Sequence, residues 1–233
     1  MVLAIVQARI NSDRFPFKIF ARFSDGSCVL ERVIKQVKYS ETVDKIVVAT
    51  NYISFNSISS FVSKLFDDVS VVSGPDNDVL ERFVRTIQIF DDVDTVIRIT
   101  ADNPLTCPRA LDLALRIHKD KKADLTHFLG IPLGTGVEVI NPVALLKASN
   151  LAHENYDREH VTPYIYKNPD SFKVLEPKFA LKSYQNYRVT LDTKEDFEFI
   201  DRLMSKLNYR IPILVEDVIE TYQEVEIESL LKI

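Results

Sequence analysis

The first half of the sequence alternates short runs of β-branched apolar residues with longer stretches in which apolar residues recur every three or four positions. The short runs predict buried strands, and the spacing in the longer stretches is that of one helix face. Strands that alternate with helices form a largely parallel sheet covered by helices on both faces. The predicted strands are 2–7, 45–50, 69–73 and 95–100, and the predicted helices are 29–38, 58–66, 78–90 and 108–118.

The second half of the sequence is less regular, which predicts a mixed edge on the sheet. Thr193 and Asp196 have the spacing of a helix N-cap with an acidic first turn. The fold class is therefore α/β, with three layers (α/β/α) and a mostly parallel mixed sheet. The strands predicted here are 124–128, 136–140 and 187–191, and the helices are 142–151, 158–166, 193–205 and 215–222.

No internal repeat, low-complexity tract or linker divides the 233 residues, so we expect a single domain over 1–233. The segment 150–185 contains the aromatic residues Tyr156, Tyr164, Tyr166 and Phe172, a content typical of protein interfaces. We interpret this segment as a candidate dimerisation or sugar-side appendage. The same aromatic residues are also typical of a core.

The charge balance excludes some classes of ligand. Lys and Arg number 29 against 34 Asp and Glu, for a net charge of −5. There is no global positive field to attract nucleic acid or an anionic membrane, so a bound anion must be held by a local group of cations. The apolar start is too short for a signal peptide, and no run approaches the roughly 18 apolar residues of a membrane span. A cytoplasmic protein is expected.

The first predicted strand runs into a polar loop that carries three cations, Arg9, Arg14 and Lys18, together with Ser12. Ligands of parallel sheets bind beyond the carboxyl ends of the strands. Arginine forks, a lysine ammonium and loop N–H groups all suit phosphate oxygens. The loop therefore predicts a phosphate site, although a solvated basic loop has the same composition.

Two aspartates follow predicted strands in the same way: Asp102 after 95–100 and Asp192 after 187–191. Magnesium in nucleotide sites is held by one or two protein carboxylates, with water and phosphate oxygens completing its shell. Each aspartate alone is equally typical of a helix N-cap. The pair, together with the basic loop, predicts a site for a nucleoside triphosphate and Mg²⁺.

Several segments, in a fixed order, resemble one known family. They are Q-A-R-x-x-S-x-R-x-P-x-K at 7–18, K-I-V-V-A-T at 45–50, D-V-L-E-R-F at 78–83, R-I-T-A-D-N-P-L at 98–105, V-E-V at 137–139, R-E-H-V-T-P-Y-I-Y at 158–166 and L-D-T-K-E-D-F at 191–197. Over residues 2 to about 205 the chain resembles the spore-coat polysaccharide biosynthesis protein F family. That family is cytidylyltransferase-like, akin to acylneuraminate and 3-deoxy-manno-octulosonate cytidylyltransferases.

The resemblance implies a nucleotide-diphospho-sugar transferase (GT-A-like) fold. It also implies that CTP and a sugar, expected to be an acidic, nonulosonate-like sugar of surface polysaccharide, give CMP-sugar and pyrophosphate. The resemblance assigns Mg²⁺ binding to Asp102 and Asp192, and catalytic roles to Lys18, Arg9 and Asp192. It also implies a homodimer. The implied nucleotide-binding residues are Gln7, Ala8, Arg9, Ser12, Arg14, Lys18, Gly74, Arg82 and Asp102, and the implied sugar-binding residues are Glu138, Arg158, Glu159 and His160.

The chain departs from the family pattern at four positions. Asn11, Phe17 and Ala101 stand where the family usually has glycine, and Gly136 stands where it has aspartate. Asparagine tolerates a left-handed backbone better than most residues, whereas phenylalanine does not. Two alternatives therefore stay open: a glycosyltransferase of the same fold that uses a preformed nucleotide sugar, and a non-catalytic nucleotide-binding relative.

Overall fold

The computed structural model describes residues 1–180 and 182–231. Within them one seven-stranded sheet has the order β3-β2-β1-β4-β6-β5-β7. The first four strands run parallel, β6 is antiparallel to β4 and β5, and β7 is parallel to β5. The parallel half and the mixed edge predicted from the sequence are both confirmed. The strands are β1 (Val2–Ala8), β2 (Lys45–Asn51), β3 (Ser70–Gly74), β4 (Thr95–Thr100), β5 (Leu125–Thr126), β6 (Glu138–Ile140) and β7 (Val174–Leu175).

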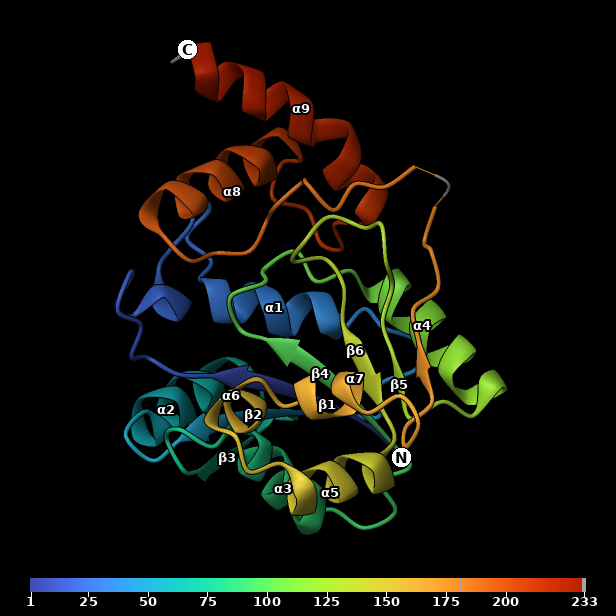
Figure 1. The fold of residues 1–233 in the computed structure, drawn as a ribbon. Helices are drawn as coiled ribbons and strands as arrows, with labels where there is room; N and C mark the ends of the chain where they lie inside the picture. Colours follow the sequence, from blue (N-terminus) through green and yellow to red (C-terminus); the bar gives the residue numbers. More distant parts are fainter. Residues whose placement is uncertain (181, 232–233) are drawn as a thin grey trace.

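Helices cover both faces of the sheet (Figure 1). Alternate residues of β1 serve the two faces: Ala4 and Val6 pack with α1, α2 and α4, whereas Leu3 and Ile5 pack with α3 and α5. No helix within the described residues is long and apolar enough to cross a membrane. The helices are η1 (Lys18–Phe20), α1 (Val29–Val37), α2 (Phe55–Leu65), α3 (Val79–Ile89), α4 (Pro108–Lys121), α5 (Pro142–Leu151), α6 (Asn155–His160), α7 (Pro163–Lys167), α8 (Lys194–Lys206) and α9 (Val215–Leu231).

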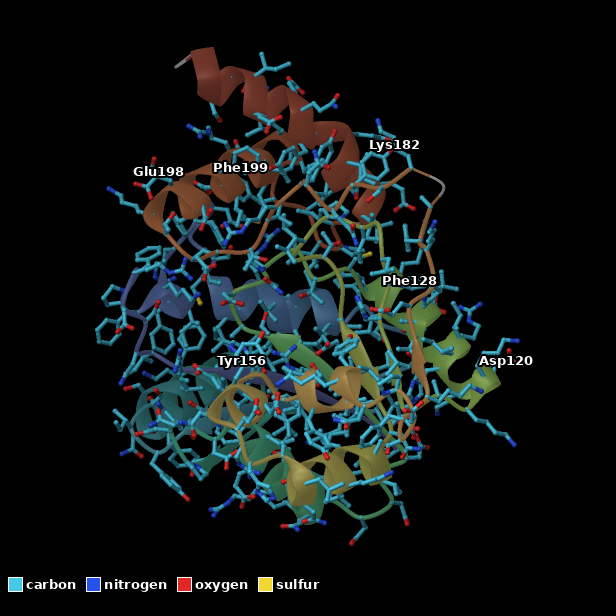
Figure 2. The ribbon with its side chains drawn as sticks, viewed as in Figure 1. Asp120, Phe128, Tyr156, Lys182, Glu198 and Phe199 are labelled. Carbon is cyan, nitrogen blue, oxygen red and sulfur yellow. The ribbon has the colours of Figure 1, made fainter. Side chains whose placement is uncertain are left out.

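The last two helices, α8 and α9, lie beyond α1, on the side away from the sheet (Figure 1). They have a core of their own, which includes Leu203 and Met204 of α8 and Val218 of α9. Phe199 of α8, labelled in Figure 2, lies 4.9 Å from Tyr222 of α9 between ring centroids. The same core buries Val189 and Leu191, so it holds the chain that leads to Asp192 against the body of the protein.

The strand order places a ligand crevice between β1 and β4. From β1 the chain builds outward through β2 and β3 on one side, then crosses to β4 on the other. Loops that leave two such strands diverge and open a crevice at their carboxyl ends. Gln7 pairs with Thr100, and the amide of Ala101 donates to the carbonyl of Gln7 at 3.0 Å. The loops after Ala8 and after Thr100 therefore start side by side.

Two predicted elements of the second half are wrong. The strand predicted at 187–191 is only a single bridge between Arg188 and Leu133, because this segment pairs with a loop and not with the sheet. The helix predicted at 158–166 is two short helices, α6 and α7, separated at Val161, which has φ 74°. Pro163 has no N–H group to continue a helix and clashes with the carbonyl four residues earlier.

The loop after β1 closes on itself at Phe17, whose amide donates to the carbonyl of Ile10 at 3.0 Å. Phe17 has φ 58° and ψ 18°, the left-handed conformation that favours glycine. Asn11 does not adopt positive φ. Of the two loop positions where the family has glycine, Phe17 is therefore the one that carries backbone strain.

Replacing Phe17 by glycine should stabilise the protein. The left-handed conformation costs a non-glycine residue about 1–2 kcal/mol, and the Phe17 side chain is 57% exposed, so little packing is lost. We expect Phe17→Gly to raise the free energy of unfolding by roughly 0.5–1 kcal/mol in urea titrations, after the added chain entropy of glycine. Phe17→Ala keeps the strained backbone and is the control; a glycine variant less stable than the alanine variant would contradict the assignment.

Candidate functional site

A cavity of about 630 Å³ lies at the carboxyl ends of β1 and β4. Its lining includes six Arg or Lys side chains and four carboxylates, a local positive excess in a chain whose net charge is −5. The cations come from the loop after β1, from α3, from β4 and from the C-terminal segment. Such a group can hold an anion that the overall charge would repel. The cations are Arg9, Arg14, Lys18, Arg82, Arg98 and Arg188, and the carboxylates are Asp13, Asp102, Glu159 and Asp192.

The ammonium of Lys18 lies at the centre of the charged part of this cavity. Its Nζ is 2.8 Å from Oδ2 of Asp102 and 3.2 Å from Oδ1 of Asp192. It also donates to the carbonyl of Leu191 at 2.7 Å. The two aspartates predicted to meet across the crevice thus both contact Nζ of Lys18. The Lys18 side chain is only 12% exposed.

Asp192 is held by cations on several sides. Arg14 Nη2 is 3.1 Å and Arg188 Nη2 is 2.6 Å from its carboxylate oxygens. Burial alone would raise the pKa of Asp192, but the hydrogen bond and charge of Lys18, with Arg14 and Arg188, outweigh it and hold the pKa below its usual value. The capping box of Thr193 and Asp196, predicted from the sequence, fixes the backbone here, since Asp196 accepts the amide of Asp192.

Arg82 of α3 is a buried guanidinium at the edge of the cavity, 2% exposed. Its Nη1 donates to the carbonyls of Pro75 and Asp76, and its Nε is buried without a partner. Burial and the nearby charge of Arg9 lower the pKa of Arg82 to about 10, so it stays charged near neutral pH. Gly74 does not line the cavity. A Cβ there would lie 2.8 Å from Cγ of Arg82, so Gly74 provides the space in which Arg82 packs.

The short helix α6 contributes Glu159 and His160 to the same cavity. Glu159 lies 3.6 Å from Arg9, and the imidazole of His160 packs on Tyr156, labelled in Figure 2, with 4.5 Å between ring centroids. Arg158 lines neither this cavity nor the smaller one described next. Its guanidinium binds Asp78 at 2.5 Å and the carbonyls of Ser149 and Ala152, contacts that attach α6 to α3 and to the end of α5.

A second cavity, of about 330 Å³, adjoins the first. Glu138 of β6 lies on its wall and accepts hydrogen bonds from three side chains. Arg98 Nη1 is 2.7 Å from Oε2, Tyr166 is 3.0 Å from Oε1, and Thr162 is within 3.1 Å of both oxygens. The sequence placed Glu138 on the sugar side, and the structure shows that its carboxylate is already occupied by protein donors.

His127 also lines the smaller cavity, with Nδ1 2.7 Å from the hydroxyl of Tyr166. Burial raises the pKa of Tyr166, so the hydroxyl keeps its proton and donates it to Glu138. His127 then donates from Nδ1 to the hydroxyl oxygen of Tyr166. The apolar part of this lining includes Phe128, labelled in Figure 2, and Ile131.

Gly136 lines the smaller cavity where the family usually has aspartate. A Cβ at this position would lie 2.7 Å from Cδ1 of Ile131, the mobile end of a side chain. Ile131 therefore fills the space that a larger residue would take. The absence of a carboxylate here makes this wall of the cavity more apolar than the family pattern implies.

The structure gathers most of the residues predicted for the site. Residues 7–9, Ser12, Arg14, Lys18, Arg82, Asp102, Glu159, His160 and Asp192 all line the larger cavity. Sequence reasoning missed Arg98, Thr100, Asn103, His127 and Arg188, which also line the cavities. Arg98 could have been identified from the sequence, because an arginine inside a buried strand must be paired to offset the cost of burying its charge.

Comparisons with known proteins show which family this chain resembles in sequence and in fold. The profile of the Cytidylyltransferase family matches residues 3–224. An uncharacterized protein of Methanocaldococcus jannaschii is 38% identical over 200 residues, covering 84% of this chain and 80% of that protein. The spore coat polysaccharide biosynthesis protein SpsF of Bacillus subtilis is 33% identical over 224 residues, covering 94% and 92% of the two chains.

A solved structure of a cytidylyltransferase from Leptospira borgpetersenii superposes with a TM-score of 0.85. It is 27% identical, and the match covers 96% of this chain and 94% of that one. The predicted fold class and the predicted enzyme class are both confirmed by these matches. This chain belongs to the Cytidylyltransferase family.

Proposed function

We propose that this chain transfers the cytidylyl group of CTP to a sugar hydroxyl, with a divalent metal and with release of pyrophosphate. The observation that supports this most is the contact of Lys18 with both Asp102 and Asp192 inside a cavity rich in cations. In this reaction the sugar oxygen attacks the α-phosphorus while pyrophosphate leaves. The protein's task is to orient the reactants and to neutralise phosphate charge.

The residues of the larger cavity suit a triphosphate. Arg9, Arg14 and Ser12 lie on one loop, with Lys18 at its end. When phosphate oxygens enter, Lys18 can exchange its carboxylate partners for them and offset the charge that builds on the leaving pyrophosphate. The buried Arg82, with its unpartnered Nε, supplies a further donor for the nucleotide.

Asp102 and Asp192 fit the role of holding a hard cation. Their oxygens converge on the single ammonium of Lys18, so both carboxylates are directed at one small volume. In the described part of the chain, no group of three or more His, Cys, Asp or Glu side chains is placed to hold a metal. Magnesium in nucleotide sites needs only one or two carboxylates. When bound, the ion would polarise phosphate oxygens and offset their charge.

The smaller cavity is the proposed place of the sugar. Its polar groups include the imidazole of His127 and the amide of Gln185, beside apolar residues such as Phe128 and Ile131. The family resemblance and the similarity to a spore coat polysaccharide biosynthesis protein favour a sugar of surface polysaccharide. Relatives named for acidic sugars make an acidic, nonulosonate-like sugar the first candidate.

The proposal is tested by incubating the protein with CTP, Mg²⁺ and a panel of sugar acids and neutral sugars while pyrophosphate is measured. Release with one sugar class supports it. Turnover of a UDP- or GDP-sugar without pyrophosphate release would instead support a glycosyltransferase. If CTP with Mg²⁺ gives neither heat in calorimetry nor a higher melting temperature, a CTP site is excluded, because a ligand that binds the folded state stabilises it.

The homodimer implied by the resemblance remains a proposal. Of the four aromatic residues that suggested an interface over 150–185, Tyr156 is 59% exposed, whereas Phe172 is 3% exposed. Tyr164 and Tyr166, both on α7, are partly buried and pack against the core that includes residues of α3 and α5. Light scattering coupled to size exclusion decides the oligomeric state directly, and a monomer at micromolar concentration would remove the proposal.

Asp102→Asn and Asp192→Asn should each lower kcat by at least about a hundredfold, since the amide removes the negative charge that holds the metal. The stimulation of CTP binding by Mg²⁺, measured by calorimetry, should fall in parallel. Asp68→Asn is the matched control, because Asp68 is an exposed carboxylate paired with Lys38 away from the cavities. Wild-type turnover in both site variants would refute the metal assignment.

Lys18→Met should have opposite effects on metal and nucleotide. Without the ammonium, Asp102 loses its ion pair and Asp192 keeps only Arg14 and Arg188, which lowers the free energy of unfolding by roughly 1–3 kcal/mol. Divalent ions should then bind the nucleotide-free protein more tightly than in the wild type, while CTP binds at least about tenfold more weakly. Mn²⁺ titration followed by electron paramagnetic resonance measures the first effect; equal Mn²⁺ affinity in both proteins would show that Lys18 does not compete for these carboxylates.

A further inference from the structure

Four residues line both cavities and so mark the junction between them: Arg98, Thr100, Asn103 and Leu133. If the triphosphate lies in the larger cavity and the sugar in the smaller one, the attacked phosphorus lies at this junction. Arg98 is the charged residue of the four. No role was predicted for it from the sequence.

Arg98 is held from both sides by the strands that flank β4. Its Nε donates to the side-chain oxygen of Gln7 on β1 at 3.0 Å, and its Nη1 donates to Glu138 on β6 at 2.7 Å. Its side chain is 16% exposed. Because Nε and Nη1 are both held, the guanidinium is oriented before any ligand binds, and Nη2 is the nitrogen left for a ligand.

The remaining edge of Arg98 is free to contact a ligand. Its Nη2 has no hydrogen-bond partner within the described residues, and it is not among their buried unpaired atoms, so it reaches the cavity. Asn103, another junction residue, has a buried side-chain oxygen without a partner.

Glu138 holds Arg98 in position, and both of its oxygens are already occupied by protein donors. Its two oxygens accept Arg98, Thr162 and Tyr166. The ion pair with Arg98 is neutral overall, so it adds little to the long-range positive field, while the guanidinium N–H groups of Arg98 can still donate to a phosphate in direct contact. This separates Arg98 from the loop cations, which supply the positive charge.

We propose that Arg98 binds the α-phosphoryl group, the one that is transferred, and that Glu138 is a positioning residue that acts through Arg98. The inference rests on the proposed cytidylyl transfer. It assigns two phosphate subsites: the loop of residues 9–18 holds the part that leaves as pyrophosphate, and Arg98 holds the part that stays with the nucleotide. Affinity contributed by Arg98 should therefore appear with CMP and be absent with pyrophosphate.

The experiment measures the binding of CMP, cytidine and inorganic pyrophosphate to the full chain by calorimetry, with ligand NMR for weak binding. In Arg98→Gln we expect CMP to bind at least about tenfold more weakly, while cytidine and pyrophosphate change by less than about twofold. Glu138→Gln should weaken CMP by a smaller factor and leave pyrophosphate unchanged. Arg109→Gln is the matched control, since Arg109 pairs with Glu216 outside both cavities.

Removing Arg98 alone leaves the buried carboxylate of Glu138 without its cation, which destabilises folds. The double variant Arg98→Gln/Glu138→Gln removes both charges, and the selective loss of CMP should persist in it. Unchanged CMP affinity in the double variant would overturn the inference while leaving the proposed function intact. Equal losses for CMP and cytidine would overturn it in favour of a structural role. A wild-type protein that binds neither CTP nor CMP would remove the proposed function and this inference together.

Discussion

The contact of one ammonium with two carboxylates and a carbonyl holds the site together. Lys18 joins the loop after β1 to Asp102 after β4 and to Leu191 and Asp192 near the C-terminus. Removing the ammonium would leave the carboxylates of Asp102 and Asp192 close together in a partly desolvated cavity, which is unfavourable. The arrangement is therefore stable only when all three segments are in place. A cation or phosphate that enters must exchange with contacts that already exist, which makes the site responsive to ligand charge.

The C-terminal segment is positioned by packing as much as by charge. Val189 and Leu191 are fully buried in the core that α8 and α9 form, and Phe197 of α8 stacks on Phe23 at 4.8 Å between centroids. Gly134, with φ 103°, lets the loop before β6 approach closely, since a Cβ there would lie 2.8 Å from the backbone of Val189. These contacts hold the segment that leads to Asp192 in a fixed position, although this segment lies outside the sheet.

Much of the fold was predictable because its first half follows regular periodicities. Buried strands such as β1 and amphipathic helices such as α3 need only local patterns to identify them. The second half was less predictable because tertiary contacts decide it. Residues 187–191 have the pattern of a strand but pair with a loop at Leu133, and the turn at Val161 divides a segment with helical spacing. β5 lies within the strand predicted at 124–128, whereas β7 spans two residues, too short for any periodicity, and was not predicted.

The candidate site shows the same division. Lys18 and Asp102 were predicted because they lie in the loops after two strands, where topology places ligands. Asp192 was predicted from a strand at 187–191 that the structure does not contain. His127 was missed because its importance comes from Tyr166 and Glu138, distant in sequence. Arg158 lies beside Glu159 in sequence, yet its side chain binds Asp78 and not the cavity. Sequence spacing locates the edge of a sheet but not the direction of a side chain on a short helix.

The order in which the chain is synthesised determines when the candidate site can form. Lys18 contacts Leu191 across 173 residues of chain. During translation the parallel strands and the basic loop leave the ribosome first, and domains begin to fold from the N-terminal side. Until α8 docks, Lys18 and Asp102 face each other without Asp192. The growing chain therefore has an incomplete centre until residues 191 and 192 have been made, and the proposed metal and nucleotide site can form only after that point.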